Sequence, residues 1–375
     1  MANEQRLRET FIELLRINNP SKCERELADC VKSRLSALGF DVTEDAAGSK
    51  IGGNTGNIIA RKSGSVPGAT SVLFSAHIDT VEPTVDLSIV MDGDTIRSDG
   101  TTILGADDKA GVAAIIEGVT SVVERGIDHG GIVLIFDVAE EIGLLGAKLV
   151  DLDAVRADVG YVLDTHGAAG GITVSAPSHE NLTIEITGKA AHAGIEPEKG
   201  VSAIVAASNA ISRMKLGRID EETTANVGQI EGGKARNIIP ERVVVRAEAR
   251  SRSEEKLAAQ VSHMRSLFEE EAARIGAQAL IEVQREYSGF RWTAEDPVVR
   301  LAVLAAQRAG ITPSFEDGGG GSDANVFNTK GVPSVLLSVG YYGPHGSSES
   351  VNMTELASAA DVVCALIKTA AETRP

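Results

Sequence analysis

The sequence predicts an α/β protein in which a second, smaller domain is inserted into the first. With 375 residues the chain is too long for a single ordinary core. In both terminal parts, apolar runs rich in β-branched residues alternate with helical patterns, which is typical of a mixed, mostly parallel sheet flanked by helices. From about Ser178, apolar and polar residues alternate instead, which indicates a sheet with one solvent-exposed face.

The chain begins with two segments that have helical periodicity. Residues 5–17 place Leu7 and Phe11 on one face, and residues 24–38 repeat the pattern before Gly39, a residue suited to the end of a helix. We expect both helices to be part of the scaffold.

An apolar strand pattern at residues 133–139 ends in the adjacent carboxylates Glu140 and Glu141. Two neighbouring carboxylates repel each other unless a cation lies beside them or they share a proton. The strand therefore indicates a metal site or a proton-sharing pair at its carboxyl end.

Residues 72–79 form a second buried-strand pattern, which runs into His77 and Asp79. Taken alone, a core histidine beside a turn aspartate is the simpler interpretation. A His-x-Asp pair nevertheless suits a metal site, because the carboxylate can accept the far ring N–H and fix the tautomer of the ligand.

Asp107 and Asp108 precede an apolar helix at residues 112–123, and a further strand pattern at 159–163 ends in Asp164. One aspartate is explained as a helix N-cap. The second carboxylate is left over, and a bridging metal ligand is one use for it.

The middle of the chain predicts a ferredoxin-like domain with the order strand, helix, strand, strand, helix, strand. The elements after the first strand are expected at residues 201–214, 226–230, 242–249, 254–275 and 279–283. A helical pattern at 297–309 and a strand pattern at 334–338 then resume the alternation of strands and helices seen in the first part of the chain. We therefore predict a larger domain formed by residues 1–177 and 288–375, with a smaller domain inserted at 178–287.

Composition limits the classes of partner. The formal net charge of −17 disfavours nucleic acid and anionic membrane surfaces, because both would repel the protein. The polar start, without a secretory pattern or an apolar run of transmembrane length, predicts a cytoplasmic protein. Cys23, Cys30 and Cys364 lack metal-type spacing and are expected to be reduced thiols.

Five potential ligands follow strand patterns or begin helices: His77, Asp107, Glu141, Asp164 and His345. In open parallel sheets, sites form beyond the carboxyl ends of the strands. Two histidines and three acids suit zinc or a similar divalent ion, and a shared aspartate would suit two metals roughly 3.5–4 Å apart.

Seven motifs along the chain carry a family resemblance: SAHIDTV (75–81), GADDKAG (105–111), EEIG (140–143), Asp164, GKAAHAG (188–194), NIIP (237–240) and GPH (343–345). In this order they resemble the co-catalytic di-zinc metallopeptidases that include peptidase T, carboxypeptidase G and the aminoacylases. The combination is specific for the family and less so for the substrate. It is most similar to the peptidase T-like branch, whose members remove the amino-terminal residue from short peptides.

The resemblance implies two Zn²⁺ ions per subunit, with Co²⁺ or Mn²⁺ as possible replacements. His77 and Asp164 would bind one ion, Glu141 and His345 the other, and Asp107 would bridge them.

The resemblance also implies roles for two carboxylates that do not bind metal. Asp79 would orient His77. Glu140 would be the general base that takes a proton from a metal-bridging water and later gives it to the leaving amine.

Three residues of the inserted domain are implied as substrate contacts. His192 would stabilise the oxyanion, Asn237 would hold a substrate carbonyl or carboxylate, and Arg250 would clamp a carboxylate. A surface role for Arg250 is an equally good interpretation. The resemblance implies that residues 1–177 and 288–375 form the catalytic domain and that residues 178–287 form a lid and dimerisation domain. Catalysis would require closure of this lid, and a dimer partner could supply His192.

The remaining histidines and a glycine loop have no firm role in this scheme. His166 could be a substrate contact, a spare ligand or a simple loop histidine, and the loop at 318–323 could face substrate or only turn the chain. His129, His179 and His263 are expected at the surface.

Three functions therefore remain open. The first is a peptidase acting on the amino end of short peptides. The second is an amidohydrolase of the same family, either an N-acyl amino acid deacylase or a carboxypeptidase. The third is a metal-binding protein without turnover. An edge strand of the inserted domain predicts a possible homodimer.

Overall fold

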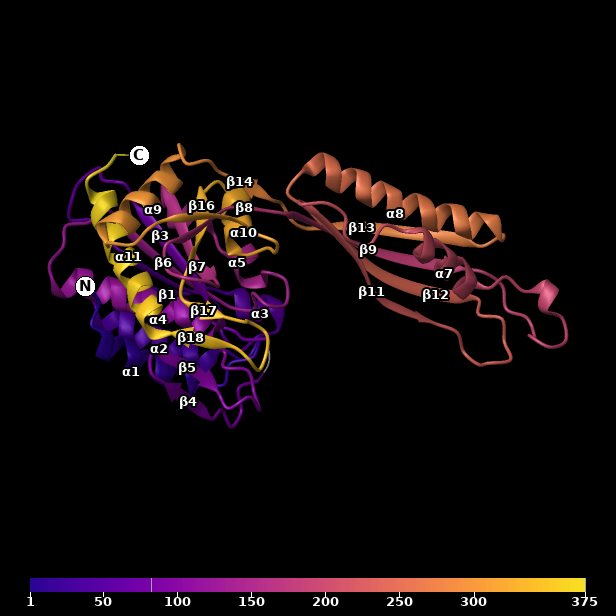
Figure 1. Ribbon diagram of the computed structural model, residues 1–375, viewed down its shortest axis with the longest axis horizontal. Coiled ribbons are helices and arrows are strands. Elements are labelled where there is room, and N and C mark those ends of the chain that lie inside the picture. The colour runs from indigo at the N-terminus through magenta and orange to yellow at the C-terminus, as the bar shows by residue number, and fades with distance from the viewer. Residues whose placement is uncertain (82, 375) are drawn as a thin grey trace. The chain divides into compact units, whose positions relative to one another are not determined.

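The computed structural model describes residues 1–81 and 83–374, which form two compact units (Figure 1). The first unit comprises Met1–Ser175, Trp292–Gly318 and the residues from Ser322 onward. The second comprises Ala176–Arg291 and Gly319–Gly321. The glycine loop divides in this way because Gly321 packs on Tyr287, whose ring would lie only 2.2 Å from a Cβ at position 321.

The main sheet of the first unit is mixed, as predicted. Its strands are ordered β1 (Asp41–Glu44), β2 (Ile58–Lys62), β6 (Ile132–Asp137), β3 (Val72–His77), β7 (Val159–Thr165), β16 (Ser334–Ser338) and β8 (Gly171–Ala176), and β15 (Ser314–Asp317) pairs with β8. β3 is parallel to both of its neighbours, with Val72 paired with Ile132 and with Val159. β1 and β2 form an antiparallel edge. The strands at the centre are buried on both faces, which explains their continuous apolar sequences.

The helices of the first unit are α1 (Glu4–Leu15), α2 (Arg25–Ala37), α3 (Ala47–Ile51), α4 (Ala106–Glu124), α5 (Leu145–Leu149), α6 (Leu152–Val155), α9 (Pro297–Arg308), α10 (Asp323–Thr329) and α11 (Met353–Ala371). α4 packs against α1, α11 and β3 and is buried over most of its length. Phe11, Phe74 and Tyr161 are among the fully buried side chains of this core.

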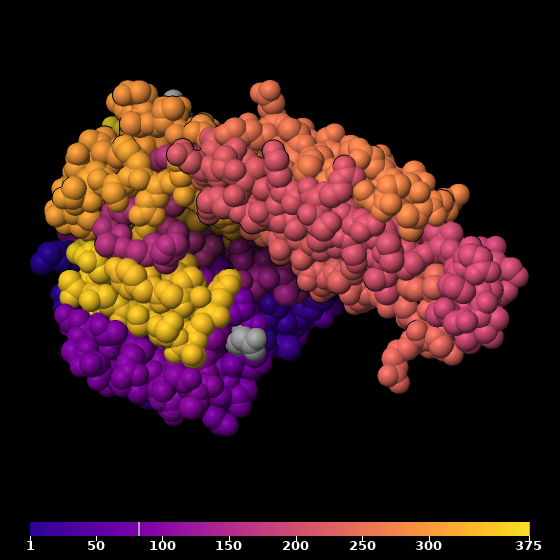
Figure 2. All heavy atoms as spheres, turned by 45° about the vertical axis from the view of Figure 1, so that its right-hand side comes forward, coloured from indigo at the N-terminus to yellow at the C-terminus, as the bar shows by residue number. Residues whose placement is uncertain are grey.

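A small second sheet joins distant parts of the first unit. It contains β17 (Tyr341–Tyr342), β18 (Ser350–Asn352), β5 (Thr95–Ser98) and β4 (Ile89–Asp92). β18 pairs antiparallel with β5, with Ser350 opposite Arg97. Figure 2 shows the result on the surface, where yellow C-terminal residues lie beside purple residues from near position 100.

The second unit has the predicted ferredoxin-like order. Its elements are β9 (Ser178–Thr187), a 3₁₀ turn (Pro197–Lys199), α7 (Ala203–Arg213), β10 (Gly217–Arg218), β11 (Thr223–Gly232), β12 (Arg242–Ser251), α8 (Glu254–Arg274), β13 (Gln278–Tyr287) and β14 (Phe290–Arg291). The antiparallel sheet has the order β10-β11-β12-β9-β13. Ile184, Val245 and Phe268 belong to a separate core formed with the two helices.

Over the described residues, no helix is both long enough and apolar enough to cross a bilayer.

Candidate metal centre

Three segments that carry predicted site residues end at the same edge of the main sheet. His77 is the last residue of β3, Asp164 lies near the end of β7, and Glu140 and Glu141 follow β6. Because β3 is parallel to β6 and to β7, the carboxyl ends of all three strands meet. The strand order therefore brings these side chains together.

Asp107 and His345 reach the same place from outside the main sheet. Asp107 lies at the start of α4, and His345 follows β17 in a left-handed conformation with φ of 64°. α4 can approach β7 closely because residue 111 is glycine. A Cβ there would lie 2.1 Å from the carbonyl oxygen of Leu163, next to Asp164.

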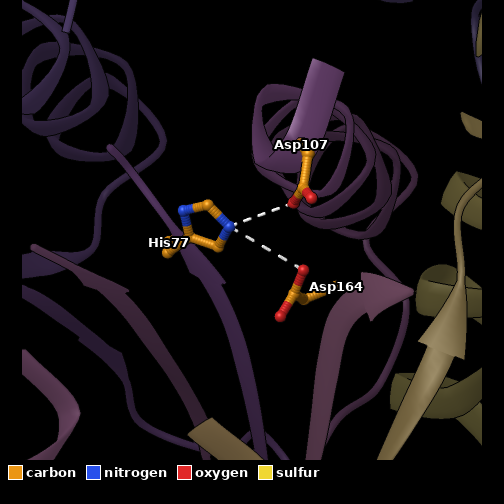
Figure 3. A group of neighbouring side chains, drawn as sticks. All are labelled: His77, Asp107 and Asp164. Carbon is orange, nitrogen blue, oxygen red and sulfur yellow. Dashed lines mark hydrogen bonds and ion pairs between the residues drawn. The ribbon is translucent and has the colours of Figure 1, made fainter. Parts of the chain in front are cut away.

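The two carboxylate oxygens of Asp107 face two different histidines. Oδ1 lies 3.1 Å from His77 Nε2, and Asp164 Oδ1 lies 3.8 Å from the same nitrogen (Figure 3). Asp107 Oδ2 lies 3.3 Å from His345 Nε2, and Glu141 Oε1 lies 3.1 Å from that nitrogen. Two clusters of potential ligands thus share one carboxylate.

Asp79 contacts both sides of the site. Its Oδ1 lies 3.4 Å from His77 Nδ1, the ring nitrogen that faces away from Asp107. The same carboxylate accepts the backbone N–H groups of Glu140 at 3.0 Å and of Glu141 at 3.3 Å. Ser21 Oγ donates to its Oδ2 at 2.5 Å. Asp79 therefore contacts both His77 and the loop that bears the two glutamates.

Glu140 is 9% exposed and belongs to a group with His77 and Glu141 whose potential ligand atoms lie within 4.8 Å of one another. Burial raises the pKa of Glu140 well above its ordinary value. A carboxyl group with a raised pKa is better suited to accept and return a proton near neutral pH than an ordinary glutamate is.

The histidines and acids of the site shift one another's pKa values. Burial lowers the pKa of His77, but hydrogen bonds to Asp107 and Asp79 outweigh it, so that the net shift is upward. The carboxylates of Asp107 and Glu141 raise the pKa of His345 to about 10. Burial raises the pKa of Asp164, and the charge of Asp107 adds to the shift. Divalent cations would replace these protons, because metal binding requires neutral histidine and ionised carboxylate.

The donor set fits two divalent cations. Each of the two clusters offers one imidazole nitrogen, one carboxylate of its own and one oxygen of Asp107. Nitrogen and carboxylate ligands of this kind are typical of zinc sites, and they are compatible with cobalt or manganese.

Two family models match the chain. One describes peptidase family M28 and matches residues 57–199, and the other describes a peptidase dimerisation domain and matches residues 178–276. Among curated relatives, an uncharacterized protein of Bacillus subtilis is 45% identical over 99% of this chain and 100% of its own. Peptidase T of Fusobacterium nucleatum is 30% identical over 74% of this chain and 68% of its own.

Two solved structures superpose on the whole chain. The aminopeptidase PepT from Bacillus cereus is 43% identical, with a TM-score of 0.91 and 99% of both chains covered. A tripeptidase from Staphylococcus aureus is 40% identical, with a TM-score of 0.94 and 100% of both chains covered. The chain belongs to the peptidase T family of metallopeptidases. The resemblance stated from the motifs is confirmed, and the protein is a hydrolase of the peptidase class.

The three predicted substrate residues lie in the second unit of this peptidase, in the part matched by the dimerisation model. His192 and Asn237 are exposed and adjacent, with the N–H of Ala193 donating to the Asn237 carbonyl at 2.9 Å. His192 Nδ1 accepts the N–H of Gly194 at 3.1 Å. In the neutral ring the proton therefore lies on Nε2, which leaves that nitrogen as a donor.

Arg250 is partly buried at the end of β12. Its Nη2 donates to Glu248 at 2.9 Å, and its buried Nε has no hydrogen-bond partner among the described residues. The guanidinium therefore has one engaged nitrogen and one buried donor still to satisfy.

The structure buries two of the three histidines predicted at the surface. His129 is 8% exposed, with Nδ1 2.7 Å from the Gly130 carbonyl oxygen. His179 is 7% exposed and lies between Glu248 and the Tyr287 ring. The prediction was wrong because distant segments cover both residues: His179 lies in β9, opposite Arg250 and Tyr287, and the backbone of His129 bonds to Ser65. His166 is exposed.

Two residues near the ligands gave no usable signal in the sequence. Glu349 is buried and accepts the N–H groups of Gly105 at 2.7 Å and of Asp107 at 2.9 Å. Tyr341 donates its hydroxyl to Asp164 Oδ1 at 3.3 Å. Neither has a spacing that distinguishes it from an ordinary core or loop residue.

Proposed function

We propose that this peptidase is a di-zinc enzyme that removes the amino-terminal residue from short peptides, tripeptides among them. The observation that carries the proposal is the shared carboxylate of Asp107, whose two oxygens face His77 and His345 at 3.1 and 3.3 Å. The tripeptidase from S. aureus, with 40% identity over the full chain, supports the substrate class.

The proposed ligands follow the two clusters. His77 and Asp164 would hold one zinc, Glu141 and His345 the other, and Asp107 would bridge them. When bound, two zinc ions lower the pKa of a water molecule and polarise the scissile carbonyl.

Glu140 is proposed as the general base. Its carboxylate would take one proton from the attacking water as the water oxygen bonds to the carbonyl carbon. It would then give that proton to the nitrogen of the leaving amine as the C–N bond breaks. Burial and the raised pKa of Glu140 support this role, because both favour reversible protonation. Asp79 would keep His77 oriented throughout.

The residues of the second unit are proposed as substrate contacts. The Nε2–H of His192 would donate to the oxyanion, and Asn237 would hold a substrate carbonyl. Arg250 would bind a substrate carboxylate with its remaining donors, since Glu248 engages only Nη2.

The alternative within the family is an amidohydrolase that removes an acyl group, or a carboxypeptidase. Both would depend on Arg250 more strongly than an aminopeptidase does.

The test is hydrolysis of a tripeptide panel, with free and acetylated amino ends, by protein reloaded with a known amount of zinc. Release of the first residue from free peptides only supports the aminopeptidase. Cleavage confined to N-acyl substrates selects the amidohydrolase, and no hydrolysis of either set would refute both proposed substrate classes.

We also propose a homodimer formed through the second unit. The dimerisation model matches residues 178–276, and β13 lies at the edge of the sheet with Leu280 65% exposed. Light scattering coupled to gel filtration tests the proposal. A Leu280→Glu variant should run at half the mass of the wild type, whereas a monomeric wild type would contradict it.

A further inference from the structure

The loop after β6 is held by side chains from three separate segments. Four consecutive backbone N–H groups, from residues 138 to 141, donate to side-chain oxygens. The acceptors are Asn57 Oδ1 at 3.1 Å, Glu24 Oε1 at 3.1 Å, Asp79 Oδ1 at 3.0 Å and Asp79 Oδ2 at 3.3 Å. The loop is therefore positioned through its backbone, which leaves the side chains of Glu140 and Glu141 available to the site.

Glu24, like Asn57, has no role in the mechanism proposed above. It is 0% exposed and directly precedes α2. Its Oε1 accepts the N–H of Lys22 at 2.7 Å as well as that of Ala139. Ala139 has a φ of 54°, a left-handed conformation that an alanine adopts only when its surroundings hold it there. Glu24 thus holds a strained residue of the loop, immediately before Glu140.

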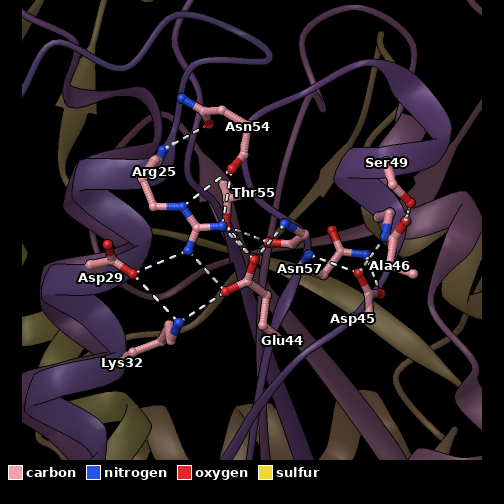
Figure 4. Close-up of polar contacts among 12 residues, drawn as sticks. Arg25, Asp29, Lys32, Glu44, Asp45, Ala46, Ser49, Asn54, Thr55 and Asn57 are labelled. Carbon is pink, nitrogen blue, oxygen red and sulfur yellow. Dashed lines mark hydrogen bonds and ion pairs between the residues drawn. The ribbon is translucent and has the colours of Figure 1, made fainter.

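A polar network fixes the segments that carry Glu24 and Asn57 (Figure 4). Arg25, the residue after Glu24, donates to Glu44 at 2.6 and 2.9 Å and to the Asn54 carbonyl at 3.0 Å. Asn57 Nδ2 donates to Asp45 Oδ2 at 2.8 Å, which aims the amide oxygen of Asn57 at the loop. Further hydrogen bonds therefore hold the segments that carry both acceptors, as a positioning group requires.

We propose that Glu24 is a positioning residue that sets the direction of Glu140 and Glu141 by holding the N–H of Ala139. The inference rests on the proposed function, in which one glutamate is the base and the other a ligand. Glu24 touches neither substrate nor metal in this scheme and acts through the loop backbone. Without the Glu24 carboxyl group, the N–H groups of Lys22 and Ala139 would lose their acceptor, and nothing from this segment would hold Ala139 in its strained conformation.

The test compares Glu24→Ala and Glu24→Gln with Glu26→Gln, which makes the same change of charge at an exposed position two residues away. In the metal-free protein, hydrogen exchange is followed over a peptide that contains residues 138–141. In the zinc-loaded protein, kcat and KM are measured on a tripeptide. We expect Glu24→Ala to lose exchange protection in this loop and to lower kcat by about 10- to 100-fold with KM unchanged. Glu24→Gln, which keeps one acceptor oxygen, should show smaller effects on both, and Glu26→Gln none.

Unchanged exchange over residues 138–141 in both Glu24 variants would overturn the inference, as would an equal fall of kcat in Glu26→Gln. If Glu24→Ala does not fold, Glu24→Gln alone decides the outcome. The exchange measurement is independent of turnover. A wild type that hydrolyses no peptide would refute the proposed function, while a loss of loop protection in the variants would still support the positioning role.

Discussion

The two units of this peptidase both have surface ion pairs, such as Arg25 with Glu44 in the first, but they differ in a cluster of acids. At the carboxyl edge of the first unit's sheet, Asp107, Glu140 and Asp164 gather with little exposure to water and with no lysine or arginine among their described ion pairs. In the second unit, charges form opposite pairs on exposed surfaces, such as Arg242 with Glu185 at 2.8 Å.

Buried acids and exposed ion pairs differ in what they indicate about function. Exposed ion pairs contribute about 0–1 kcal/mol each, whereas a buried carboxylate costs several kcal/mol unless a cation or hydrogen bonds compensate. A cluster of buried acids is therefore a reason to look for a metal, and a pattern of surface pairs is not. The predictions below test whether this contrast holds.

The largest effect is expected at Glu140. Glu140→Gln should lower kcat on a tripeptide by about 10²- to 10⁴-fold, because the amide cannot accept a proton from water. Bound zinc, measured by elemental analysis, should not change, since Glu140 is not a proposed ligand. Glu255→Gln, on the exposed first turn of α8, is the control and should be fully active. Full activity of Glu140→Gln would refute its role as the base.

The next effect is the stabilisation of the first unit by metal. At a free zinc concentration about 1,000 times the dissociation constant, one bound ion adds about 4 kcal/mol to the free energy of unfolding. Calorimetry with zinc and with a chelator should show this difference. Asp107→Asn should lose it, because the shared ligand is weakened in both clusters. Equal stabilisation of wild type and variant would place the metal elsewhere.

A smaller effect is expected from the pH dependence of stability. Burial raises the pKa of Glu24 from its ordinary value of 4.5 to about 7. Between these values the folded protein retains a proton that the unfolded chain has lost, so stability falls as pH rises, by at most about 1.4 kcal/mol per pH unit.

Urea unfolding of the metal-free protein between pH 4.5 and 7 tests this prediction. Glu24→Gln should remove part of the downward slope, and Glu26→Gln should leave the slope as in the wild type. Parallel curves for the wild type and Glu24→Gln would show that Glu24 does not titrate in this window.

The smallest effect is expected in the second unit. Arg242→Ala should leave the free energy of unfolding nearly unchanged, and high salt should remove any difference, because the side chains of the pair are 60% and 38% exposed. Ile184→Ala, in the core of the same sheet, should cost about 2–5 kcal/mol and serves as the comparison. A larger cost for Arg242→Ala would break the contrast between the two units.

Much of this molecule could be predicted from local patterns. The strands that lead to His77 and Glu140 can be recognised from the apolar pattern of their own residues. The order of elements in the second unit likewise predicts its ferredoxin-like sheet. The same patterns predicted a mixed sheet with sites at the carboxyl ends of its strands, because that location depends on strand direction alone.

Only the tertiary structure decided how these groups contact one another. The division of the Asp107 oxygens between His77 and His345 requires α4 and the C-terminal loop to meet. The hydrogen bond from Ala139 to Glu24 joins residues 115 positions apart. The burial of His129 has the same origin. Sequence periodicity determines which face of an element is apolar, but which polar groups meet depends on packing between elements, where a shift of about 1 Å makes or breaks a hydrogen bond.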